Sequence, residues 1–150
     1  MVISAASQGP PGGEEPARAA ALEPSRTAAA IGDEDLPLVD PAVLEELEDE
    51  LYPPALATNF AKDYVEFWPQ RERRLIAALA AADSRTALDA AISVRVSSDM
   101  VGARRLAALA RALEAALRGG DLSGGPVGAL VSVHGRATVD ELQARYLRYR

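Results

Sequence analysis

Few side chains in this chain could carry acid–base, nucleophilic or metal chemistry, and histidine is the scarcest of them. The 150 residues hold one histidine, His134, and no cysteine. A histidine can accept a phosphoryl group or bind a metal, but a zinc site needs further histidine or cysteine ligands. No serine or carboxylate is spaced around His134 for catalysis. We therefore expect His134 to be a structural or surface residue, and whether it has a function stays open.

Other catalytic motifs are also missing from the sequence. It contains no P-loop, glycine-rich dinucleotide loop, catalytic triad or metal-binding motif. Without cysteine there is neither a disulfide framework nor a thiolate metal site, as is usual in a reducing compartment. We expect a protein that is not an enzyme and that needs no metal or cofactor.

The composition limits the fold class and the partners. Hydrophobic residues make up 49% of the chain and aromatic residues 5%, and the net charge is -6. The negative charge and the scarcity of stacking side chains argue against nucleic-acid binding. No apolar run reaches the roughly 18 residues that span a bilayer, so we expect a cytoplasmic protein that does not bind membranes. Abundant alanine and few β-branched residues predict an all-α protein.

Two regions differ in composition. Residues 1–37 are rich in proline, glycine and alanine and contain few large apolar side chains. Such a segment cannot bury enough apolar surface to offset its ordering entropy, so we expect a disordered tail. Residues 38–150 carry apolar side chains at helical spacing and are expected to form one helical bundle.

The first two helices of this bundle are marked by capping residues and prolines. Asp40 is a good N-cap before Pro41, which predicts a short helix that ends at the prolines of residues 53–54. A long helix is expected from Ala55, and Pro69 should kink or split it. Its aromatic residues recur at helical spacing and are expected in the core rather than in a ligand site: Phe60, Tyr64, Phe67 and Trp68.

Three further helical segments follow: residues 85–100, a segment from near Gly102 to the glycines at 119–120, and a long imperfect helix from Pro126. Short connections make successive helices antiparallel neighbours. The expected fold is therefore an up-and-down four-helix bundle with a short extra N-terminal helix.

The helix over residues 85–100 has two contrasting faces. At 100° per residue, its inward stripe consists of small and apolar residues: Ala87, Ala90, Ala91, Val94, Ser97, Ser98 and Val101. The opposite face carries aliphatic and charged residues: Leu88, Ile92, Arg95, Val96 and Asp99. An outward aliphatic strip of this kind often marks a contact surface.

Residues 91–103 read A-I-S-V-R-V-S-S-D-M-V-G-A. This stretch resembles the signature of histidine-containing phosphotransfer (HPt) domains, approximately A-H-S-L-K-G-S-S-A-N-L-G-A. The likeness extends over roughly residues 39–120 and implies a helical bundle that passes phosphoryl groups between response-regulator receivers. The matching residues are Ser93, Ser97, Ser98, Gly102 and Ala103. Ile92 stands at the histidine position, and isoleucine cannot carry a phosphoryl group.

The resemblance thus implies a phosphotransfer-inactive protein of two-component phosphorelay signalling. It would dock a receiver domain or a sensor kinase as an adaptor or competitor, with Leu88, Ile92, Arg95, Val96 and Asp99 as the partner-docking face. Arg95 keeps the positive charge of the family's lysine, whereas Val96 adds bulk where the family has glycine.

Two alternatives stay open for the same face. The bundle could self-associate through Leu88, Ile92 and Val96 as a structural interaction module without a phosphorelay role, which would give a monomer or weak homodimer. Alternatively, an N-terminal or C-terminal segment could cover the strip and make it ordinary core.

Overall fold

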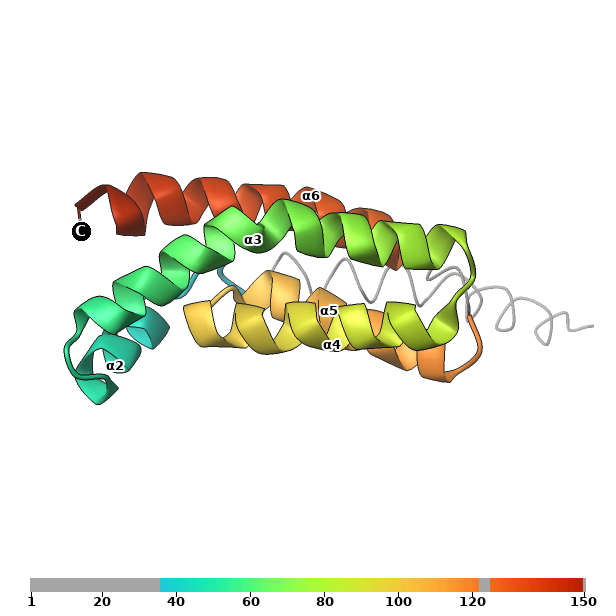
Figure 1. Cartoon of the computed structure of the whole chain (residues 1–150), viewed down its shortest axis with the longest axis horizontal. Coiled ribbons are helices and arrows are strands. Elements are labelled where there is room, and N and C mark those ends of the chain that lie inside the picture. Colours follow the sequence, from blue (N-terminus) through green and yellow to red (C-terminus); the bar gives the residue numbers. More distant parts are fainter. Residues whose placement is uncertain (1–35, 122–124, 150) are drawn as a thin grey trace, which may run out of the picture.

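The computed structural model describes residues 36–121 and 125–149, and these two ranges are helical without a strand (Figure 1). The helices are α2 (Pro41–Glu50), α3 (Ala55–Ala80), α4 (Ser84–Val101), α5 (Arg104–Arg118) and α6 (Gly125–Glu141). A π-helical turn, Leu142–Tyr146, and a short 3₁₀ turn, Leu147–Tyr149, continue α6. None of the helices in these ranges is long and apolar enough to cross a bilayer. Residues 1–35, most of the expected disordered tail, lie outside the described residues.

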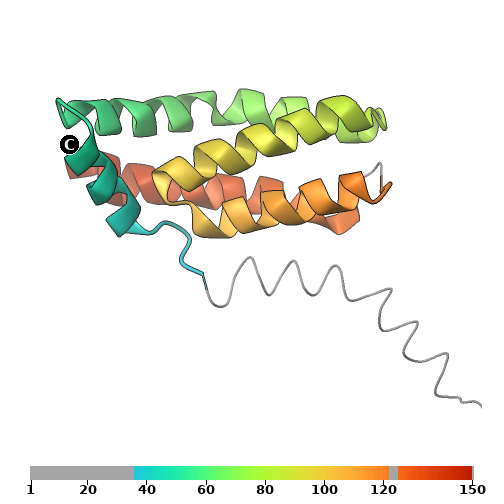
Figure 2. The same cartoon turned by 90° about the horizontal axis from the view of Figure 1, so that it is seen from below.

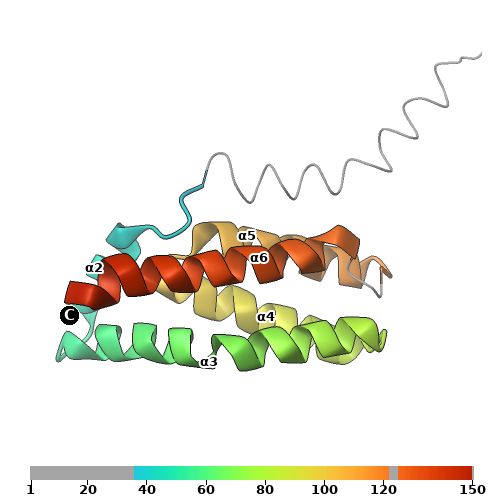
Figure 3. The same cartoon turned by 90° about the horizontal axis from the view of Figure 1, so that it is seen from above.

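The four long helices run in alternating directions and pack side by side (Figures 2 and 3). α4 packs against α3 and α5, while α6 packs against α5 and α3, so each helix has two neighbours. The short helix α2 lies across one end and contacts α3 and α4. The expected all-α class, with one short helix before four longer ones, is confirmed.

The start of α2 is fixed to the turn between α4 and α5. As expected, Asp40 caps the helix: its side chain accepts a hydrogen bond from the Ala42 amide at 3.1 Å. The Asp40 amide donates to the Gly102 carbonyl at 2.8 Å. Gly102 has a φ of +78°, and a Cβ there would overlap the Asp40 carbonyl oxygen. Only glycine therefore allows this close approach of the two segments.

Arg104, at the first position of α5, strengthens the same junction. Its Nε donates to the Asp40 carboxylate at 2.8 Å. The hydrogen bond from Arg104, with that from the Ala42 amide, lowers the pKa of Asp40. One aspartate thus caps α2 and joins it to α5.

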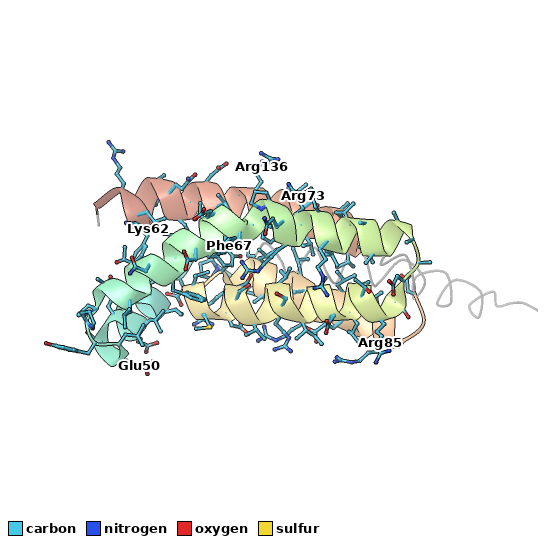
Figure 4. All side chains as sticks on the ribbon, viewed as in Figure 1. Glu50, Lys62, Phe67, Arg73, Arg85 and Arg136 are labelled. Atoms are coloured by element: carbon cyan, nitrogen blue, oxygen red, sulfur yellow. The ribbon has the colours of Figure 1, made fainter. Side chains whose placement is uncertain are left out.

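A kink or a split was expected at Pro69. Helix α3 is continuous across this residue, so it does not split, and its axis bends along its length in Figure 1. Tyr64 and Trp68 are buried, and Phe60 packs against the core. Phe67 is 42% exposed (Figure 4), and its expected place in the core is wrong. It lies about 60° around the helix from Tyr64, which puts it at the edge of the buried stripe.

The contact between α3 and α6 is close because a glycine faces the only tryptophan. A Cβ at Gly135 would overlap the ring of Trp68, whereas a Cβ at Gly128 would meet only the end of the flexible Leu79 side chain. Gly135 therefore lets the two helices approach around a large indole ring.

We predict that Gly135→Ala destabilises the protein although alanine is the better helix former. Overpacking a close-packed core typically costs about 1–3 kcal/mol, which exceeds the gain of about 1 kcal/mol in helix propensity. Urea unfolding followed by circular dichroism measures the difference. The matched variant Gly128→Ala should change the free energy of unfolding by less than about 1 kcal/mol; equal stability of the two variants would contradict the prediction.

Candidate functional site on helix α4

The inward face of α4 is confirmed residue by residue. The buried residues of this helix are Ala87, Ala90, Ala91, Val94, Ser97, Ser98 and Val101. The Ser97 hydroxyl donates to the Ser93 carbonyl within α4 at 2.7 Å. The Ser98 hydroxyl instead lies 2.9 Å from the Tyr64 hydroxyl on α3. Small side chains and this buried polar contact seat α4 against α3, and an exposed ion pair between Arg74 and Asp89 also joins the two helices.

Tyr64 is among the largest fully buried side chains of the described part. Burial raises the pKa of Tyr64 to about 12, against the opposing effect of its hydrogen bond with Ser98. The phenol is therefore a neutral group that bridges two helices at physiological pH.

The predicted docking face is only partly exposed. Val96 is 46% exposed and Asp99 is also exposed, whereas Leu88, Ile92 and Arg95 are half-buried. Leu88 packs against the core, so its expected outward position is wrong. It lies about 20° around the helix from Arg95, whose ion pair with Glu114 marks the flank of α4 that faces α5.

Met100 extends the exposed part of this face and was not singled out from the sequence. It is 41% exposed and follows Val96 by four residues, a spacing that places both on the same side of a helix. Ile92, Val96 and Met100 form an i, i+4, i+8 row, which we call the aliphatic strip. The i+4 spacing alone would have indicated Met100.

Ion pairs with α5 neutralise the charges on the flank of this strip. Arg95 Nε lies 2.5 Å from Glu114 Oε2, and Asp99 pairs with Arg111 at 2.8 Å. Glu114 is only 4% exposed and also lies 3.3 Å from Arg118. Its hydrogen bond with Arg95 raises the pKa of that arginine. Arg95 is therefore committed to a buried carboxylate rather than free to meet an anionic partner.

The C-terminal segment, one of the two segments that could have covered the strip, does not cover it. α6 packs against α5 and α3, on the other side of the bundle from the outer face of α4 (Figure 1). The alternative cover, the N-terminal segment, falls in residues 1–35, outside the described residues. Within the described part, Val96 and Met100 stay exposed.

His134 lies on α6, away from this face. Its Nδ1 is 3.0 Å from the Leu130 carbonyl oxygen, and its own carbonyl accepts a hydrogen bond from Thr138 at 2.7 Å. Across residues 36–121 and 125–149 there is no group of three or more histidine, aspartate or glutamate side chains placed to hold a metal. The geometry gives His134 a local contact on its own helix.

Comparison of the chain with protein-family models, curated proteins and solved structures found no match. The motif supplies the inward residues, and the geometry supplies the aliphatic strip with its paired charges.

The raised pKa of Tyr64 predicts a specific loss of stability at alkaline pH. The folded state holds the proton to about pH 12, whereas the unfolded tyrosine loses it near 10. The stabilisation is therefore complete below pH 10 and falls by about 1.4 kcal/mol per pH unit above it. Tyr64→Phe should flatten this slope in urea unfolding between pH 9 and 12. Tyr52→Phe, which alters an exposed ring, should keep it; equal slopes in both variants would rule out Tyr64 as the origin.

Proposed function

We propose that this protein is a degenerate HPt-like module that docks a response-regulator receiver through the outer face of α4 without accepting a phosphoryl group. The observation that carries the proposal is the aliphatic strip: Val96 and Met100 are exposed, and the half-buried Ile92 stands where the motif has its histidine. The alternating directions of the four long helices support it, because HPt domains share this architecture.

The surroundings of the strip suit a protein partner. Interfaces commonly combine an apolar centre with a polar rim. Here the rim charges are already paired: Arg95 with Glu114 and Asp99 with Arg111 on the side of α5. A partner can therefore bury the strip without leaving one of these charges unpaired, which would cost free energy.

The same residues argue against phosphotransfer at this site. Ile92 has no nucleophilic atom, and Val96 places a branched side chain beside it. Arg95, the counterpart of the family's lysine, is held by Glu114. Binding without chemistry, as an adaptor or as a competitor of active HPt domains, fits this arrangement.

Self-association through the strip is the second candidate function. Stable interfaces bury about 1,200–2,000 Å² in total, which three aliphatic side chains cannot supply alone. The aliphatic strip could therefore stabilise at most a weak homodimer. Sedimentation of the unaltered protein and of Ile92→Asp over a range of concentrations separates a self-associating module from a monomer that docks a receiver.

We predict that Ile92→Asp weakens receiver docking about thirtyfold or more, because it places a charge within an apolar contact. Calorimetric titration against purified receiver domains of the same organism measures the affinity, and circular dichroism confirms the fold. Val133→Asp is the matched control, since Val133 is 64% exposed on α6. Undiminished receiver binding by a folded Ile92→Asp variant would refute the docking face.

A second variant tests the relation to phosphotransfer. Ile92→His combined with Val96→Gly restores a nucleophile and removes the branched neighbour. We expect this variant, unlike the unaltered protein, to acquire acid-labile phosphate from a phosphorylated receiver. Adding His134→Gln ensures that the phosphate is not on the native histidine. A variant that docks the receiver yet stays unphosphorylated would argue against the HPt-like register of α4.

A further inference from the structure

A small cleft of about 190 Å³ lies between α3 and α4. Its walls are formed by Gln70, Arg71, Arg74, Ala90 and Ser93. Pockets for drug-sized molecules are larger, about 300–1,000 Å³. The cleft therefore suits a single small group rather than an extended ligand.

Arg71 is the most unusual residue of this cleft. Its guanidinium lies 5.9 Å from the centre of the Tyr64 ring. Its Nη1 is buried and has no hydrogen-bond partner. No carboxylate in the described part of the chain forms an ion pair with it. Buried charged donors are normally satisfied, so an unpaired one points to a missing acceptor.

Further unused donors line the same cleft. The side chains of Gln70 and Ser93 have no hydrogen-bond partner among the described residues. Arg74 is engaged only on one nitrogen, with Asp89 at 3.3 Å. Two arginines against one aspartate leave the cleft with a net positive charge. Guanidinium groups, amides and hydroxyls together present the donors that a tetrahedral oxyanion accepts.

We propose that this cleft binds a phosphate-sized oxyanion, held by Arg71 and Arg74 with hydrogen bonds from Gln70 and Ser93. The anion would satisfy the buried nitrogen of Arg71 and bridge α3 to α4. This site lies on the α3 side of α4, whereas the Arg95–Glu114 pair lies on the α5 side. The proposal is independent of receiver docking and of any nucleophile at position 92.

Calorimetric titration of the full chain with inorganic phosphate in a chloride buffer tests the site. We expect saturable binding of one anion per chain, and a loss of about tenfold or more in affinity for Arg71→Gln. Arg73→Gln is the matched control, because it removes the same charge from the same helix. Arg73 is exposed (Figure 4) and does not line the cleft. It should retain the affinity of the unaltered chain.

Because Arg71 also packs on Tyr64, its replacement can disturb the fold, and Arg74→Gln provides a second test at a half-exposed side chain. It should weaken phosphate binding severalfold while the protein stays folded.

Parallel titration with phenyl phosphate identifies the source of the anion. Tighter binding than that of inorganic phosphate indicates a phosphate group carried on an organic molecule, and equal or weaker binding indicates the free ion. Absence of saturable binding of either probe, or an equal loss in Arg73→Gln, would overturn the proposal.

Discussion

The hydrogen bond between Tyr64 and Ser98 fixes how α4 is rotated against α3. Both residues are buried, so separating them would leave a hydroxyl without water or a partner, which costs about 1–3 kcal/mol. With Ser98 held inward, the helical period places Ile92 and Val96 outward. The α3–α4 cleft depends on the same seating, because Arg71 lies against the Tyr64 ring. The positions of the outer face and of the cleft therefore both depend on one buried hydrogen bond.

The two flanks of α4 differ in how their charges are satisfied. Towards α5, Glu114 is buried and holds both Arg95 and Arg118. Towards α3, Arg71 is partly buried and has no carboxylate among the described residues. The charges on the α5 side of α4 are thus paired within the fold, whereas the positive charge of Arg71 on the α3 side has no carboxylate partner among the described residues. The docking surface and the small-anion cleft that we propose can coexist on one helix because they use different sides of it.

The inward face of α4 could be predicted from the sequence, because small residues at a 3.6-residue period leave only one stripe to bury. The role of Asp40 as the N-cap of α2 and the end of α5 at Gly119 could also be predicted. The exposure of Phe67 and the shielding of Leu88 were not, because each depends on how closely a neighbouring helix approaches. The partner of Arg95 is 19 positions away on α5, and nothing in the local pattern identifies Glu114. Arg71 is one of three arginines in residues 71–74, and only the fold reveals that it has no carboxylate partner among the described residues.

The glycine opposite Trp68 has a practical consequence for work on this molecule. The chain has one tryptophan, and its indole nitrogen is buried in the seam between α3 and α6. Tryptophan fluorescence, excited selectively over that of the tyrosines, therefore reports on that seam. A ligand on the outer face of α4 should leave the emission maximum in place, whereas separation of α6 from α3 would expose the ring to water and shift it to the red. The protein thus carries its own optical probe for distinguishing surface binding from opening of the bundle.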